Sequence, residues 1–121
     1  MADTDAAHGT LGKEFYVILT RPVKPAEEVM KVLPKHLERQ VELEKAGILF
    51  AAGPLFEDGA ERAHAGLIII RAKSFAEAKE IADADPLHAA GLREYTVDRW
   101  SLNEGSYSLT VNYSDQTVSI G

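Results

Sequence analysis

The chain has 121 residues, of which 45% are hydrophobic and 26% are charged, which is the balance of one globular domain. The absence of cysteine excludes disulfides, thiolate metal sites and cysteine nucleophiles. The formal net charge of −6 argues against nucleic acid and anionic membranes as partners, because both attract basic surfaces.

The N-terminal residues are small and polar, and they contain no apolar segment of the kind found in signal peptides. The longest aliphatic run, Leu67–Ile70, is too short to cross a bilayer. These patterns predict a cytoplasmic protein with a loose N-terminal tail over residues 1–12.

The first strand and the first helix are predicted from the pattern of residues 15–46. Aromatic and β-branched side chains over residues 15–19 indicate a strand. A helix is expected over residues 25–46, since leucine and valine recur there at a spacing of four and Gly47 is a common helix stop. Pro34 lies inside this pattern, so we expect either a kink there or two helical pieces.

Two further strands are predicted on either side of a polar turn. Residues 48–52 form the second strand, which Gly53-Pro54 closes, and residues 65–71 form the third. Asp58-Gly59 is the strongest turn signal between them.

A second helix and a fourth strand complete the pattern. Ser74 and Glu77 fit a capping box, so the helix begins there. It ends before Asp85, because the residue preceding a proline is disfavoured in a helix, and Asp85 can cap a short turn over residues 86–90. Residues 94–102 read as the fourth strand.

The order β-α-β-β-α-β predicts an α+β, ferredoxin-like fold over residues 13–104. It has a four-stranded antiparallel sheet with two helices on one face. Residues 105–121 alternate apolar and polar residues around a turn, which predicts a C-terminal β-hairpin. A lone hairpin is marginally stable in water, so we expect it to dock on something.

The predicted sheet is apolar on both faces, because adjacent strand residues point to opposite sides. In the first strand Val17 and Leu19 oppose Tyr16 and Ile18. Two helices cover one face only, and leaving the other wet forgoes several kcal/mol at roughly 25 cal/mol per Å². We therefore expect a homodimer or higher homo-oligomer, with the hairpin as the competing cover for that face or as an extension of the partner's sheet.

Three short motifs together resemble the YCII-like family over about residues 13–102. They are Leu-Pro-Lys-His-Leu-Glu at 33–38, Gly-Ile-Leu-Phe-Ala-Ala-Gly-Pro at 47–54 and Ala-Asp-Pro-Leu-His-Ala-Ala-Gly-Leu at 84–92. The resemblance implies a dimeric α+β barrel with a catalytic pair at His36 and Asp85. It also implies lyase or isomerase chemistry, since a few relatives dehydrochlorinate hydroxyquinols and similar barrels isomerise or dehalogenate muconolactones. The C-terminal hairpin departs from the family pattern.

The types and positions of His36 and Asp85 also indicate acid/base chemistry. His36 lies at the edge of the apolar stripe of the first helix, and Asp85 lies where the second helix ends, so both can reach a cleft between helices and sheet. An imidazole can exchange a proton near neutral pH, and a neighbouring carboxylate fixes its tautomer. Two alternatives remain open: His36 as a packed residue, and Asp85 as a helix cap alone.

Three other side chains are candidates for binding a substrate. Arg21, at the end of the first strand, can hold an anion or be a solvated loop residue. Tyr16 can line an aromatic pocket with Trp100 or pack in the core. His64 precedes the third strand and is either a ligand contact or a surface residue. We expect no metal, since no histidine pair has a helical or strand spacing that would chelate one.

Two hypotheses follow from these residues. The first is a small cofactor-independent lyase or isomerase, in which His36 and Asp85 perform acid/base chemistry on an oxygenated ring or lactone. The second is a non-catalytic module that binds a small ligand or acts as an accessory protein, because fold does not fix function. Under the first hypothesis, the His36 ring and the Asp85 carboxylate lie within reach of each other and open to a pocket.

Overall fold

The structure is a computed structural model that describes residues 11–121. Residues 14–101 form one compact unit and residues 102–121 belong to another. The predicted N-terminal tail lies almost entirely outside the described residues. No helix in the described part of the chain is both long and apolar enough to span a membrane.

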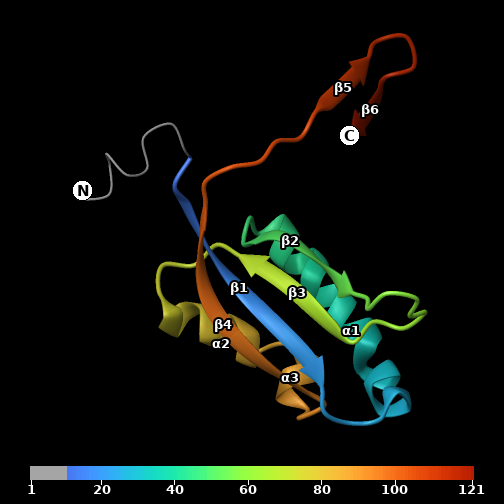
Figure 1. The fold of residues 1–121 in the computed structure, drawn as a ribbon, viewed down its shortest axis with the longest axis vertical. Helices are drawn as coiled ribbons and strands as arrows, with labels where there is room; N and C mark the ends of the chain where they lie inside the picture. The colour runs from blue at the N-terminus through green and yellow to red at the C-terminus, as the bar shows by residue number, and fades with distance from the viewer. Residues whose placement is uncertain (1–10) are drawn as a thin grey trace. The chain divides into compact units, whose positions relative to one another are not determined.

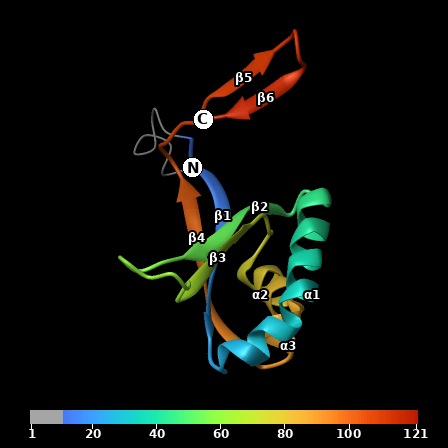
Figure 2. The same ribbon diagram turned by 90° about the vertical axis from the view of Figure 1, so that its right-hand side faces the viewer.

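The larger unit has the predicted ferredoxin-like fold. Its elements are β1 (Lys13–Pro22), α1 (Ala26–Lys45), β2 (Leu49–Leu55), β3 (Ala65–Ile70), α2 (Phe75–Asp83), α3 (Pro86–Ala89) and β4 (Arg93–Leu102). The strands form an antiparallel sheet in the order β2-β3-β1-β4, and Figures 1 and 2 show all three helices on one face of it. This order of elements and strands is the α+β arrangement that the sequence predicts.

The two prolines that the sequence treats as breaks lie inside regular elements. Pro34 is within α1, which is one continuous helix and not two pieces, although Figure 2 shows its first turns at an angle to the rest. Pro54 is within β2, which continues to Leu55. β2 is an edge strand, so one of its sides has no neighbouring strand. A proline is tolerated there, because its missing N–H would have had no strand to bond to on that side.

The core lies between the sheet and α2. Tyr16, Ile18, Ile68 and Ile70 project from the two central strands toward the helices and pack there with Ala78 and Ala82 of α2. The small alanine side chains let α2 approach the sheet closely, which leaves the cavity described below between α1 and the other half of the sheet.

The opposite face of the sheet is apolar over β1 and β3, whereas β4 is polar on this face from Glu94 to Asp98. Phe15 is buried beneath the rings of Phe50, at 4.3 Å between centroids, and Trp100, at 6.0 Å. Two cross-strand aliphatic pairs, Val17 with Ile69 and Leu19 with Leu67, are partly exposed. In β4 the outward positions are the exposed Glu94, Thr96 and Asp98, so the apolar area is narrower than the sequence predicts.

The C-terminal unit contains the expected hairpin. Strands β5 (Leu109–Asn112) and β6 (Thr117–Ile120) pair antiparallel, with Leu109 opposite Ile120 and Val111 opposite Val118. These four aliphatic side chains lie on one face of the hairpin and are exposed. The expectation that the hairpin docks on another surface therefore stays a prediction.

Candidate active site

His36 and Asp85 lie in direct contact. His36 lies in the middle of α1, and Asp85 is the residue that caps α3. His36 Nδ1 and Asp85 Oδ2 are 2.7 Å apart. The two side chains are 15% and 6% exposed respectively, so the pair is largely shielded from water.

Each oxygen of the Asp85 carboxylate has a donor. Oδ1 accepts from the Leu87 backbone N–H at 2.9 Å, which is the N-cap contact that the sequence predicts, and Oδ2 faces His36. Burial alone would raise the pKa of Asp85, but the hydrogen bonds from His36 and the Leu87 N–H, with a smaller electrostatic contribution from the two neighbouring histidines, hold it below its usual value.

The state of Asp85 fixes the tautomer of His36. An ionised carboxylate can only accept, so Nδ1 of His36 must donate to it. The other ring nitrogen, Nε2, then carries the free lone pair of the neutral imidazole. This is the arrangement in which a histidine can act as a general base.

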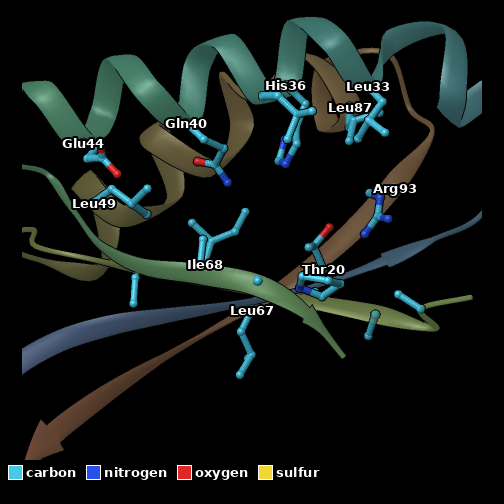
Figure 3. A pocket seen from close by; sticks show the side chains of 18 of the residues that line it. Thr20, Leu33, His36, Gln40, Glu44, Leu49, Leu67, Ile68, Leu87 and Arg93 are labelled. Atoms are coloured by element: carbon cyan, nitrogen blue, oxygen red, sulfur yellow. The ribbon is translucent and has the colours of Figure 1, made fainter. Parts of the chain in front are cut away.

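His36 lines a cavity of about 730 Å³ between α1 and the sheet. Figure 3 shows its ring directed into this space from α1, opposite the strands. The apolar part of the wall includes Leu33, Leu49, Ile68 and Leu87, and the polar part includes Thr20, His36, Gln40 and Arg93. The arrangement therefore combines an oriented imidazole with a mostly apolar pocket and a few polar groups, which is typical of small-molecule sites.

A second histidine fixes the hydroxyl of Thr20, which is buried at the floor of the cavity. His88 Nδ1 donates to the Ala82 carbonyl at 2.7 Å, because a carbonyl can only accept. In the neutral ring, Nε2 is then an acceptor, and Thr20 Oγ1 lies 2.8 Å from it. The Thr20 proton thus points to His88, and the oxygen lone pairs are left for a ligand.

Gly66 keeps the floor of the cavity open next to Thr20, its partner across β1 and β3. A Cβ atom at Gly66 would lie 3.3 Å from Thr20 Cγ2 and 3.8 Å from Arg93 Nη1. Any larger side chain at this position would extend into the space that the polar groups surround.

The other candidates from the sequence do not line this cavity. Arg21 is exposed at the end of β1, and His64 is exposed before β3. Tyr16 is buried in the core, edge-to-face with Phe75 at 5.1 Å. Among residues 11–121, no three histidine or carboxylate side chains are grouped as a metal site would require.

Four polar residues of the wall were not candidates in the sequence: Thr20, Gln40, Glu44 and Arg93. Two of them carry a signal that can be recognised. Gln40 follows His36 by four residues, which places both on one face of a helix. Arg93 has the same parity in β4 as Tyr95 and Val97, which pack on the helix side.

Comparison with known proteins gives a family and similar solved structures. The structure of 5-chloro-2-hydroxyhydroquinone dehydrochlorinase from Burkholderia phenoliruptrix, in complex with 2,5-dihydroxybenzoquinone, is 22% identical in sequence to this chain. The match covers 70% of this chain and 92% of that one with a TM-score of 0.58, and at this identity it shows a common fold. No curated protein matches the sequence. A YCII-related domain matches residues 15–101, most of the chain, which therefore belongs to the YCII-related domain family.

Proposed function

We propose that this protein is a small cofactor-independent lyase or isomerase that acts on an oxygenated ring or lactone. His36 is the general acid/base, and Asp85 orients it and stabilises its protonated form. The observation that carries the proposal is the 2.7 Å contact between His36 Nδ1 and a buried carboxylate, with the same imidazole facing a cavity.

The proposed lyase or isomerase reaction requires one proton acceptor in a mostly apolar pocket. His36 Nε2 takes a proton from a carbon or hydroxyl next to a carbonyl group, and the electron pair left behind forms a new double bond. The carboxylate of Asp85 stabilises the imidazolium by a charge-assisted hydrogen bond. In an isomerase the proton returns at another carbon, and in a lyase the electron pair expels an anionic leaving group.

The similar structure supports a lyase at the level of reaction class. It is named as a dehydrochlorinase, and its bound molecule is a hydroxylated ring compound. The cavity volume of about 730 Å³ also lies within the range of roughly 300–1,000 Å³ that is usual for small-molecule sites.

A second candidate function is a non-catalytic module that binds a small ligand. The observation in its favour is that Asp85 caps α3 through Leu87, so its burial also has a structural reason. In that case the cavity and the pair would serve recognition and packing without proton transfer.

Substitution of His36 separates the two functions. The native protein would be assayed with a panel of chlorinated hydroxyquinols and unsaturated lactones, beside His36→Ala and His36→Gln. The enzyme proposal expects turnover to fall by roughly a hundredfold or more in both variants. Turnover that is unchanged in both variants, or ligand binding by the native protein with no turnover across the panel, would favour the binding module.

We infer further that two copies of the chain associate through the apolar part of the outer sheet face. The support is the partly exposed strip of Val17, Leu19, Leu67 and Ile69, which no helix of the described unit covers. A homodimer is the simplest assembly that buries such a strip on both chains.

A further inference from the structure

We propose that Arg93 is an anion-binding residue of the cavity and that the natural ligand is a ring compound bearing a carboxylate. This inference rests on the proposed function for the location of the site, and it adds the chemical class of the ligand. The structural basis is a buried guanidinium N–H without a partner in the wall that also holds His36.

Arg93 is placed for this role by the sheet. It is the first residue of β4 and shares its side of the strand with Tyr95 and Val97, which pack against the helix-side core. Figure 3 shows the guanidinium entering the cavity below α1 at the same end as His36 and Thr20. A ligand that reaches Arg93 is therefore also within the space that the His36 ring faces.

The Arg93 guanidinium lacks a hydrogen-bond partner at one buried atom. Its Nε is shielded from solvent and has no acceptor. A buried donor left without an acceptor is costly, and a carboxylate can satisfy Nε and a terminal nitrogen together in the bidentate geometry that arginine favours.

The Arg93 guanidinium itself carries the positive charge that an anion would bind. Burial lowers the pKa of Arg93 and the charge of Asp85 partly offsets this, while the guanidinium stays protonated at neutral pH. Both Asp85 oxygens already accept, from His36 and from the Leu87 N–H. Glu44 is the carboxylate among the residues that line the cavity, and Figure 3 shows it at the opposite end from Arg93, so an anion bound at Arg93 would lie away from that negative charge.

Acceptors elsewhere in the wall explain why the ligand should carry hydroxyl groups as well. Gln40 Oε1 is buried without a donor. Thr20 directs its proton to His88, so its oxygen is free to accept. A carboxylate at Arg93 with a hydroxyl toward Gln40 or Thr20 would satisfy groups that the protein leaves unpaired.

The test compares an acid with its neutral amide on the full-length protein. Gentisate and gentisamide have the same ring and hydroxyl groups and differ only in the carboxylate. Calorimetric titration should show gentisate binding at least about tenfold more tightly to the native protein, which is the usual worth of a charge-assisted hydrogen bond. Arg93→Met should abolish this preference and leave the affinity for gentisamide within about twofold.

The controls separate this inference from folding and from the proposed function. Arg99→Met, on an exposed arginine of the same strand, should keep the preference. Arg93→Gln serves if thermal unfolding shows that Arg93→Met is not folded. His36→Ala should keep the preference even where it abolishes turnover. Equal affinity for acid and amide, no binding of gentisate at millimolar concentration, or a preference that survives loss of Arg93 would overturn the inference without touching the role of His36.

Discussion

Asp85 has two partners, one for each carboxylate oxygen, and substitution can separate their effects. An asparagine keeps an oxygen for the Leu87 N–H, and asparagine is as good a helix N-cap as aspartate. Its amide NH₂ would face His36 Nδ1 and require that nitrogen to accept. The proton would then reside on Nε2, where the base is needed.

We therefore expect Asp85→Asn and Asp85→Ala to differ in stability but not in activity. Asp85→Asn should lose roughly a hundredfold or more in turnover and should lose less unfolding free energy than Asp85→Ala, because it keeps the cap and loses only the charged contact with His36. Asp85→Ala should lose the same activity and about 1 kcal/mol or more of stability, because the cap is lost as well. Urea unfolding and initial rates measure both. An active, folded Asp85→Asn would reduce Asp85 to a cap.

Asp85 also predicts how stability depends on pH. Its pKa in the folded state is below the unfolded value of about 3.9, so the folded state binds the proton less well than the unfolded chain. The stabilisation is complete above that unfolded value and is lost as the pH falls through the lower folded pKa. Urea unfolding at steps from neutral pH to pH ~3 should give a shallower loss for Asp85→Asn than for the native protein. The same slope for both would contradict the shift.

The residues of the site that can be predicted from the sequence lie in local motifs, and those that cannot are brought together only by the fold. His36 and Asp85 lie in recognisable motifs, and a cap before a proline has a local signature. Arg93 and Thr20 have no motif, because their role arises only where the ends of β1 and β4 come together beneath α1. Arg21 is adjacent to Thr20 in β1 and does not line the cavity, because neighbouring residues of a strand point to opposite faces of the sheet.

The sequence predicts the ends of helices and strands correctly where packing with the rest of the chain does not act against the local preference of the residues. The capping box is half formed as predicted: Ser74 Oγ accepts from Glu77 N, while Glu77 Oε1 accepts from Lys73 N. At Pro34 the helix is not divided in two, and its first turns lie at an angle to the rest, which agrees with the alternative expectation of a kink. The strand end expected at Pro54 did not occur, because the edge position of β2, which is not visible in a short window of sequence, tolerates a proline.

The register of β1 and β3 gives a prediction of its own. Gly66 opposes Thr20 and lies in the cavity wall, so Gly66→Val should fill the floor beside Arg93. Valine favours strands and the backbone there is not in the left-handed region, but a Cβ would crowd Thr20 Cγ2 at 3.3 Å, so thermal unfolding must first show that the variant is folded. We expect a loss of ligand affinity of tenfold or more, about 1.4 kcal/mol, measured by titration with unchanged strand content in circular dichroism. Undiminished binding would place the ligand elsewhere.

The dimer proposed above depends on the outer face of the sheet. Its aromatic end is already covered, since Phe15 is buried under Phe50 and Trp100 with the Arg71 guanidinium over two of the rings. The aliphatic strip beyond it is the part that a second copy would bury. The sequence predicted apolar residues on both faces, and only the observed β4, polar on its outer side, limits the strip to β1 and β3.

A charge in the middle of this strip should separate the two copies. Ile69 pairs with Val17 across the central strands, so Ile69→Arg places a cation where the sheets would meet. Sedimentation should show a dimer for the native protein and a monomer for Ile69→Arg, because an unpaired charge buried in an interface costs several kcal/mol. Met30→Arg, at a 61% exposed position on α1, is the matched control and should remain dimeric.

The hairpin supplies the competing explanation, and it is tested in the same measurement. Val111→Lys charges the aliphatic face of β5 and β6 without altering the sheet. If the sheet face is the interface, this variant stays dimeric and Ile69→Arg does not. The reverse result would make the hairpin the contact between copies, and a native protein that is monomeric at micromolar concentration would remove the dimer altogether. Since His36 and Arg93 of the same chain line the cavity, we expect the affinity for gentisate to be the same in monomer and dimer.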